Sequence, residues 1–159
     1  NGHNHAAFPF KSQSTGKFFI VTGDEWFPWR YPNKPRPYMP RGGFHFLDFT
    51  DIKNPKEVAL YDIPEAGSHN HWIKGDTLYA AYYQGGLRIV DISGELMGDL
   101  YRQGREIAFF QTGHQKGHIS NAPNVWGTIP YKGLIFFTDM YSGLYCVRLV
   151  EKDKKRSTP

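Results

Sequence analysis

The chain has 159 residues, of which 40% are hydrophobic, 21% charged and 16% aromatic, enough apolar material for one domain with a core. Aromatic residues abound and the strong helix formers Ala and Leu are scarce, which predicts an all-β fold and argues against a helical bundle or a disordered chain. Residues 28–41 carry a charge of +4 and residues 151–159 one of +2, so the rest of the chain is at −2 and no broad basic face for nucleic acid is expected.

Three pairs of predicted strands follow one another along the chain. Each pair opens with an apolar run that follows a turn signal, at residues 18–22, 78–82 and 134–138. Each pair closes with a segment that starts with glycine, and these segments are 43–49 (GFHFLDF), 86–92 (GLRIVDI) and 143–149 (GLYCVRL). No run approaches the roughly 18 apolar residues that a membrane-spanning helix needs.

The spacing of these pairs indicates an internal repeat. From the second copy to the third, the turn and the glycine both shift by 57 residues and the apolar run by 56. From the first copy to the second, the turn shifts by 59 residues and the glycine by only 43, and a 16-residue insertion at 26–41 accounts for the difference. Each copy is therefore predicted to be a β-hairpin, with a long loop inserted in the first.

Further strands extend each hairpin. Residues 57–61 and 106–110 are predicted to follow the first two hairpins, and residues 70–74 and 125–129 to precede the last two. Four short antiparallel strands in each repeat are typical of β-propeller blades. A β-sandwich, the alternative, has turn signals but no such long-period similarity. The predicted core comprises Leu78, Ala80, Leu87, Ile89, Ile135, Phe137, Leu144 and Cys146.

Residues 81–93 (AYYQGGLRIVDIS) resemble the LVIVD repeat, which builds β-propellers in bacterial and archaeal proteins. The resemblance spans about three copies over residues 2–150 and is best in the second, whereas the third has Arg148 where the others have Asp48 and Asp91. It implies an exported or surface-associated protein, hence a periplasmic, extracellular or cell-surface location. The family has no single assigned activity, so the resemblance implies an architecture and not a reaction.

Three blades fall short of the four to eight that close a propeller. We therefore expect residues 1–150 to be blades of an incomplete ring or the C-terminal part of a larger propeller, and residues 151–159 a charged flexible tail. The chain begins with Asn1 and shows no signal-peptide pattern, which fits a mature product or a piece of a longer protein. Its single cysteine, Cys146, forms no internal disulfide and does not indicate the compartment.

Histidines are the candidate chemical groups. Seven occur, clustered as His-Asn-His at 3–5 and 69–71 and as His114 with His118, while His45 stands apart. Residues i and i+2 of a strand share a face, so each His-Asn-His could present two imidazoles, which suit Zn, Cu, Fe or Ni. The predicted metal ligands are His3, His5, His69, His71 and His118.

Two other roles stay open for these histidines. Each imidazole could instead hydrogen-bond a backbone group and fix a loop, which is the favoured interpretation, or act as a pH-sensitive switch. No acidic cluster completes a metal site in the sequence, and the third repeat has Trp126-Gly127 in place of the motif. The neighbouring Asp24 and Glu25 are expected to form an acidic turn, because adjacent strand residues point to opposite faces.

The insertion at 26–41 is rich in proline and aromatic residues. Exposed Trp, Tyr and Arg are typical of protein interfaces, so this loop either docks on a partner chain or folds back on its own blade. The predicted partner-binding residues are Trp26, Phe27, Trp29, Arg30, Tyr31 and Tyr38.

The leading functional hypothesis is a non-catalytic β-propeller scaffold that binds other protein chains or the remaining blades of the ring, in a surface or membrane-associated assembly. Unpartnered blades would expose apolar sheet faces, which favour association. The alternative is a metal-dependent oxidoreductase or hydrolase with a histidine site at the propeller axis. Signatures for serine hydrolases, zincin metalloproteases, phosphate loops and dinucleotide sites are absent from the sequence.

Overall fold

A computed structural model describes residues 3–27, 40–64 and 66–150 of the chain. These residues form β-strands, turns and loops and contain no helix, which confirms the predicted all-β class. Accordingly, no helix long and apolar enough to cross a membrane is found in this part of the chain.

The first two sheets are antiparallel meanders of four neighbouring strands. The first has the order β1-β2-β3-β4, with the short β8 added parallel to β4, and the second has the order β5-β6-β7-β9. Their strands are β1 (Asn4–Lys11), β2 (Phe18–Asp24), β3 (Phe44–Asp48), β4 (Lys56–Tyr61), β8 (Gly98–Asp99), β5 (His71–Lys74), β6 (Thr77–Tyr82), β7 (Gly86–Asp91) and β9 (Glu106–Phe110).

The third sheet repeats the first three strands of the second. In the described residues it consists of β10 (Val125–Tyr131), β11 (Leu134–Asp139) and β12 (Gly143–Val147). The 57-residue offset also preserves the register of the central hairpin, because Leu78 pairs with Val90 and Ile135 pairs with Val147.

The turns that open the two hairpins repeat as well. Gly75 precedes β6 with a φ of 59°, and its equivalent Lys132 precedes β11 together with Gly133, with φ values of 48° and 77°. Glycine adopts this backbone conformation without the steric penalty that a side chain would bring. The glycines thus account for the position of these turns in the chain.

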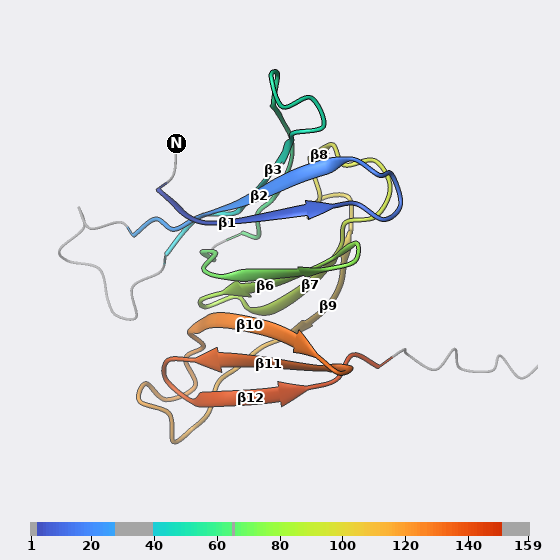
Figure 1. Ribbon diagram of the computed structural model, residues 1–159. Coiled ribbons are helices and arrows are strands. Elements are labelled where there is room, and N and C mark those ends of the chain that lie inside the picture. The colour runs from blue at the N-terminus through green and yellow to red at the C-terminus, as the bar shows by residue number, and fades with distance from the viewer. Residues whose placement is uncertain (1–2, 28–39, 65, 151–159) are drawn as a thin grey trace, which may run out of the picture.

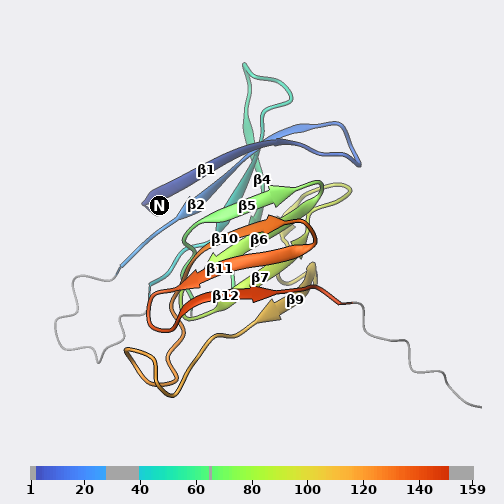
Figure 2. The ribbon, with the colours of Figure 1, turned by 60° about the horizontal axis from the view of Figure 1, so that its bottom comes forward.

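The three sheets lie one after another in chain order in Figure 1, and Figure 2 shows the third sheet in front of the second. Their first strands are neighbours, since β5 contacts both β1 and β10. Side chains of the first sheet, such as Phe19 and Phe46, pack against Leu78 and Ala80 of the second. The second sheet is covered on its other face by the third, where Leu87 and Ile89 pack with Ile135 and Phe137. A propeller remains a prediction, since these sheets form a stack within the described residues.

Six of the eight predicted core residues are buried, and two predictions are wrong. Leu78, Ala80, Leu87, Ile89, Ile135 and Phe137 are each at most 4% exposed. Leu144 is 72% exposed and Cys146 is an exposed free thiol. Leu144 and Cys146 are exposed because they lie on the face of the third sheet that points away from the second sheet. No described segment packs on that face.

Candidate functional site

His5 lies at an irregularity of β1. The pairing of β1 with β2 shifts in register between Asn4 and Ala6, so His5 sits at a bulge. Bulges redirect a side chain from the regular alternation of a strand. Here the imidazole is 31% exposed and lies beside Glu25.

Glu25 and His69 approach the same point from two other segments. Glu25 directly follows β2, and its backbone N–H donates to the carbonyl of His3. His69 precedes β5, and its N–H donates to the carbonyl of Ala81 at the end of β6. The site therefore forms where the first and second sheets meet.

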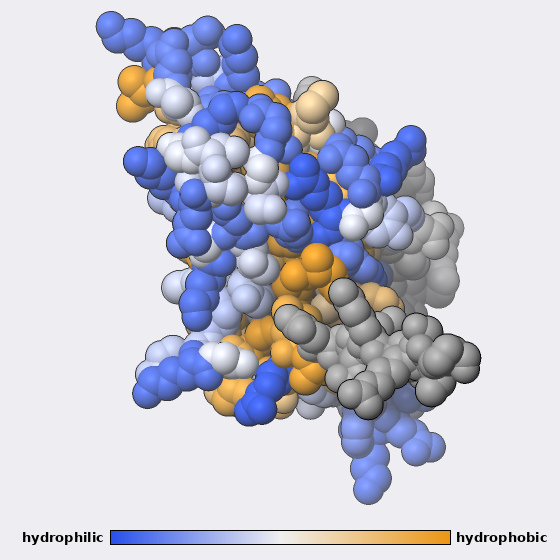
Figure 3. Space-filling model, turned by 90° about the vertical axis from the view of Figure 1, so that its right-hand side faces the viewer, coloured by the Kyte–Doolittle hydropathy of each residue, from blue (hydrophilic) through white to orange (hydrophobic). Residues whose placement is uncertain are grey.

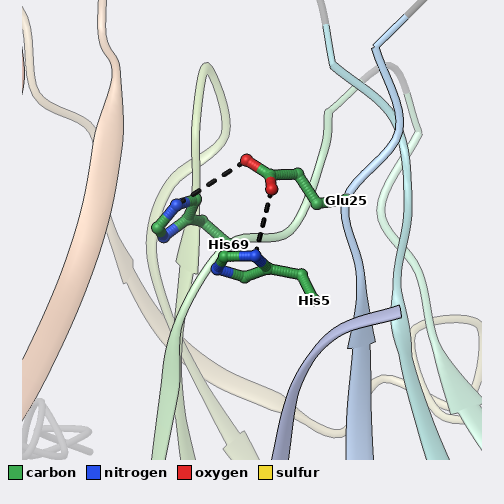
Figure 4. Close-up of side chains that lie close together, drawn as sticks. All are labelled: His5, Glu25 and His69. Atoms are coloured by element: carbon green, nitrogen blue, oxygen red, sulfur yellow. Dashed lines mark ion pairs between the residues drawn. The ribbon is translucent and has the colours of Figure 1, made fainter. Parts of the chain in front are cut away.

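The Glu25 carboxylate lies between the two imidazoles (Figure 4). His5 Nδ1 is 3.1 Å from Glu25 Oε2, and His69 Nε2 is 3.7 Å from Glu25 Oε1. The ring centroids of His5 and His69 are 4.5 Å apart. One ligand atom from each of the three residues lies within 4.8 Å of the others. Among the described residues, this is the group of side chains that could hold a metal ion.

Hydrogen bonds on the far side of each ring fix its orientation. His5 Nε2 lies 3.2 Å from Asn70 Oδ1, an oxygen that can only accept, so this nitrogen is the donor. His69 Nδ1 donates to the carbonyl of Trp126 at 2.6 Å. The Tyr83 hydroxyl donates to Glu25 Oε1. Each ring thus directs its other nitrogen at the carboxylate.

Burial sets the protonation of two groups in this cluster. Burial lowers the pKa of His69, so the ring is neutral at neutral pH. Burial, together with the hydrogen bond to Glu25, raises the pKa of Tyr83, so the phenol keeps the proton that it donates. A neutral His69 whose Nδ1 carries hydrogen has a lone pair on Nε2.

The other predicted metal ligands lie outside this group. His3 and His118 are exposed, and the His118 ring lies against Tyr141. His71 is buried, 4.7 Å from the Phe44 ring by centroids, and burial lowers its pKa to about 4. Neither ring nitrogen has a hydrogen-bond partner of ordinary geometry, and the nearby backbone of Val21 only partly offsets the effect of burial on the pKa.

The two His-Asn-His motifs are not structurally equivalent. Phe8 pairs with Val21 and His71 pairs with Ala80. Val21 and Ala80 are themselves related by the 59-residue offset, so Phe8 occupies the place of His71. The histidines that meet are the bulged His5 and the pre-strand His69.

Sequence reasoning missed Glu25. The acidic pair was visible beside the insertion, and the structure confirms that its members point apart, because Asp24 contacts His45 at 3.1 Å while Glu25 faces His5. The contact of Glu25 with the two histidines could not be predicted, because Glu25 is 20 residues from His5 and 44 residues from His69 in the sequence.

Only the ends of the inserted loop are described. Trp26 is 41% exposed and forms a bridge with Arg41 that closes the base of the loop. The Phe27 ring centroid lies 5.5 Å from that of Tyr83, directly after β6. The remaining predicted partner-binding residues, Trp29, Arg30, Tyr31 and Tyr38, lie outside the described residues.

A second candidate site is the outer face of the third sheet. Ile129, Phe136 and Cys146 form one row across its three strands, and Leu144 pairs with Thr138 beside them. Ile129 is 52% exposed and Leu144 is 72% exposed. An open pocket of about 520 Å³ is lined by residues of all three sheets, including Phe8, Trp72 and Ile129. Figure 3, which views the stack from one side, shows apolar surface in its lower half.

Comparison with known proteins gives no relative from which a role can be transferred. No family model matches the chain, and neither a curated protein nor a solved structure matches it. The geometry of the two candidate sites is therefore the basis for assigning a function.

Proposed function

We propose that the chain forms consecutive blades of a β-propeller and serves as a non-catalytic scaffold that binds another protein chain. The observation that carries this proposal is the open apolar face of β10, β11 and β12, hereafter the open face. Large exposed apolar patches are typical of protein interaction sites. The resemblance to the LVIVD repeat supports the propeller and an exported or surface-associated assembly.

The internal repeat indicates what kind of surface fits the open face. Leu144 and Cys146 are the 57-residue equivalents of Leu87 and Ile89. Those two residues are buried because the next sheet packs on them with Ile135 and Phe137. The open face is therefore suited to a further β-sheet with apolar side chains. A second copy of the chain presents such a sheet, namely its own open face.

The lone cysteine provides a direct test. Cys146 is on the open face and is the single thiol of the chain, so its labelling by a maleimide reports on that face alone. We expect labelling to slow as protein concentration rises, in parallel with association measured by sedimentation. Leu144→Asp should keep labelling fast at every concentration, because a charge on an apolar interface opposes burial.

A matched control is Ile52→Asp, which alters a 77% exposed apolar side chain in the loop between β3 and β4. This variant should associate like the unmodified chain. A chain that stays monomeric, with Cys146 labelled at one rate over the whole concentration range, would contradict a scaffold that pairs with a second copy through its open face.

A further inference from the structure

The cluster of His5, Glu25 and His69 has an excess of electron-rich atoms. Each neutral imidazole has one nitrogen that carries hydrogen and one that carries a lone pair. His69 uses its N–H on Trp126, and His5 uses its N–H on Asn70. Both remaining nitrogens face the oxygens of Glu25. Two lone pairs and a carboxylate directed at one another require a positive charge among them.

A proton satisfies only part of this arrangement. A second proton on His5 would make its 3.1 Å contact with Glu25 a charge-assisted hydrogen bond. It would leave His69 Nε2, 3.7 Å from the carboxylate, with its lone pair toward an anion. Protonating His69 as well is opposed by burial, which lowers the pKa of that ring.

A metal ion satisfies all three groups together. Ligands at about 2.0–2.2 Å from a tetrahedral ion are about 3.4 Å from one another. The contacts of 3.1 Å to Glu25 Oε2 and 3.7 Å to Glu25 Oε1 lie on either side of that value. One ligand atom from each of the three residues lies within 4.8 Å of the others, so the side chains close in by about an ångström around the ion. Metal-binding histidines also typically donate their other N–H to a carbonyl or carboxylate, as His69 donates to Trp126.

We propose that His5, Glu25 and His69 bind one divalent transition-metal ion of the Zn²⁺, Fe²⁺ or Cu²⁺ type. Two imidazoles and one carboxylate suit these ions, whereas Mg²⁺ and Ca²⁺ prefer sets of oxygen ligands. Three protein ligands leave a coordination position for water or another ligand, as in catalytic zinc sites. The partial exposure of His5 gives solvent access to that position.

The first measurement is calorimetric titration of the metal-free chain with Zn²⁺, and with Mg²⁺ as the unsuited ion. We expect one Zn²⁺ per chain and no Mg²⁺ binding. Glu25→Gln and His5→Gln should each weaken Zn²⁺ affinity at least about tenfold. Gln at position 25 keeps an oxygen that can accept from Tyr83, so the fold is expected to persist, as circular dichroism would verify.

His118→Gln is the matched control, because it also removes an imidazole but from an exposed position outside the cluster. It should bind Zn²⁺ like the unmodified chain. A Cu²⁺ complex should give an electron paramagnetic resonance spectrum with coupling to two nitrogens. Zn²⁺ binding that is absent, or that persists unchanged in both Glu25→Gln and His5→Gln, would overturn the proposal.

Discussion

At the scale of single residues, the surroundings of His45 and His69 shift the pKa of the same type of side chain in opposite directions. His45 Nδ1 contacts Glu57 at 2.7 Å and its Nε2 contacts Asp24 at 3.1 Å. Burial opposes the charge on His45, but these carboxylates outweigh it and raise its pKa. At His69, burial prevails and lowers the pKa. His45 is thus suited to an ion pair and His69 to a neutral ligand.

The raised pKa of His45 predicts a pH-dependent contribution to stability. Protonated His45 stabilises the folded chain fully below its unfolded pKa of about 6.5, and the contribution is lost as pH rises through the folded value. His45→Gln should therefore lower the free energy of unfolding by about 1 kcal/mol at about pH 5.5 and by less at about pH 9. Denaturant unfolding at both pH values measures this difference.

The charged groups that face His45 are Asp24 on β2, Glu57 on β4 and, by charge interaction, Asp62. His118→Gln serves as the control, since its ring contacts Tyr141 and no carboxylate among the described residues. An equal loss of stability for His45→Gln at both pH values would show that His45 contributes packing and not charge.

At the scale of elements, the same strand position is buried in one sheet and exposed in the next. Leu87 of β7 is 1% exposed and its repeat equivalent Leu144 of β12 is 72% exposed. Leu87→Ala should cost roughly 2–5 kcal/mol, the range for a packed core leucine. Leu144→Ala should cost under about 0.5 kcal/mol in the monomer, as exposed substitutions do.

Denaturant unfolding at low protein concentration compares this pair of variants, and low concentration keeps the open face free of partners. Similar losses for Leu87→Ala and Leu144→Ala would mean that β12 is covered in the isolated chain. A Leu87→Ala effect below about 0.5 kcal/mol would place that residue outside the packed core.

At the scale of the whole molecule, the three sheets differ in how much of each is covered. The central strands of the second sheet, β6 and β7, are buried on both faces, whereas the third sheet packs through one face and exposes the other. Local opening has a lower free energy where fewer apolar contacts are broken. Amides of β11 and β12 should therefore exchange with solvent at a lower opening free energy than amides of β6 and β7.

Native-state hydrogen exchange resolved by residue measures this order. Protection in β6 and β7 should reach the free energy of global unfolding, and protection in β12 should fall below it. Equal opening free energies in all three sheets would show that the stack unfolds as one unit.

Much of the fold could be predicted from the sequence, because strand formation is local. The turns at Gly75 and Gly133, the hairpins and the strands that flank them follow from glycine placement and apolar spacing. Of the candidate site, His5 and His69 could be identified through their clustering. Glu25 could not, and neither could the bulge that turns His5 toward it.

The sequence by itself determined the hairpins and the strands that flank the last two of them, because alternation and turn signals act within short segments. It did not predict β1 or β8. Tertiary structure decided which faces are covered and which side chains meet. Leu87 and Leu144 hold equivalent positions by the 57-residue offset, yet only Leu87 is buried, because another sheet packs on the face of the sheet that carries it. Likewise His5, Glu25 and His69 meet because separate strand ends converge, and such convergence depends on how sheets stack.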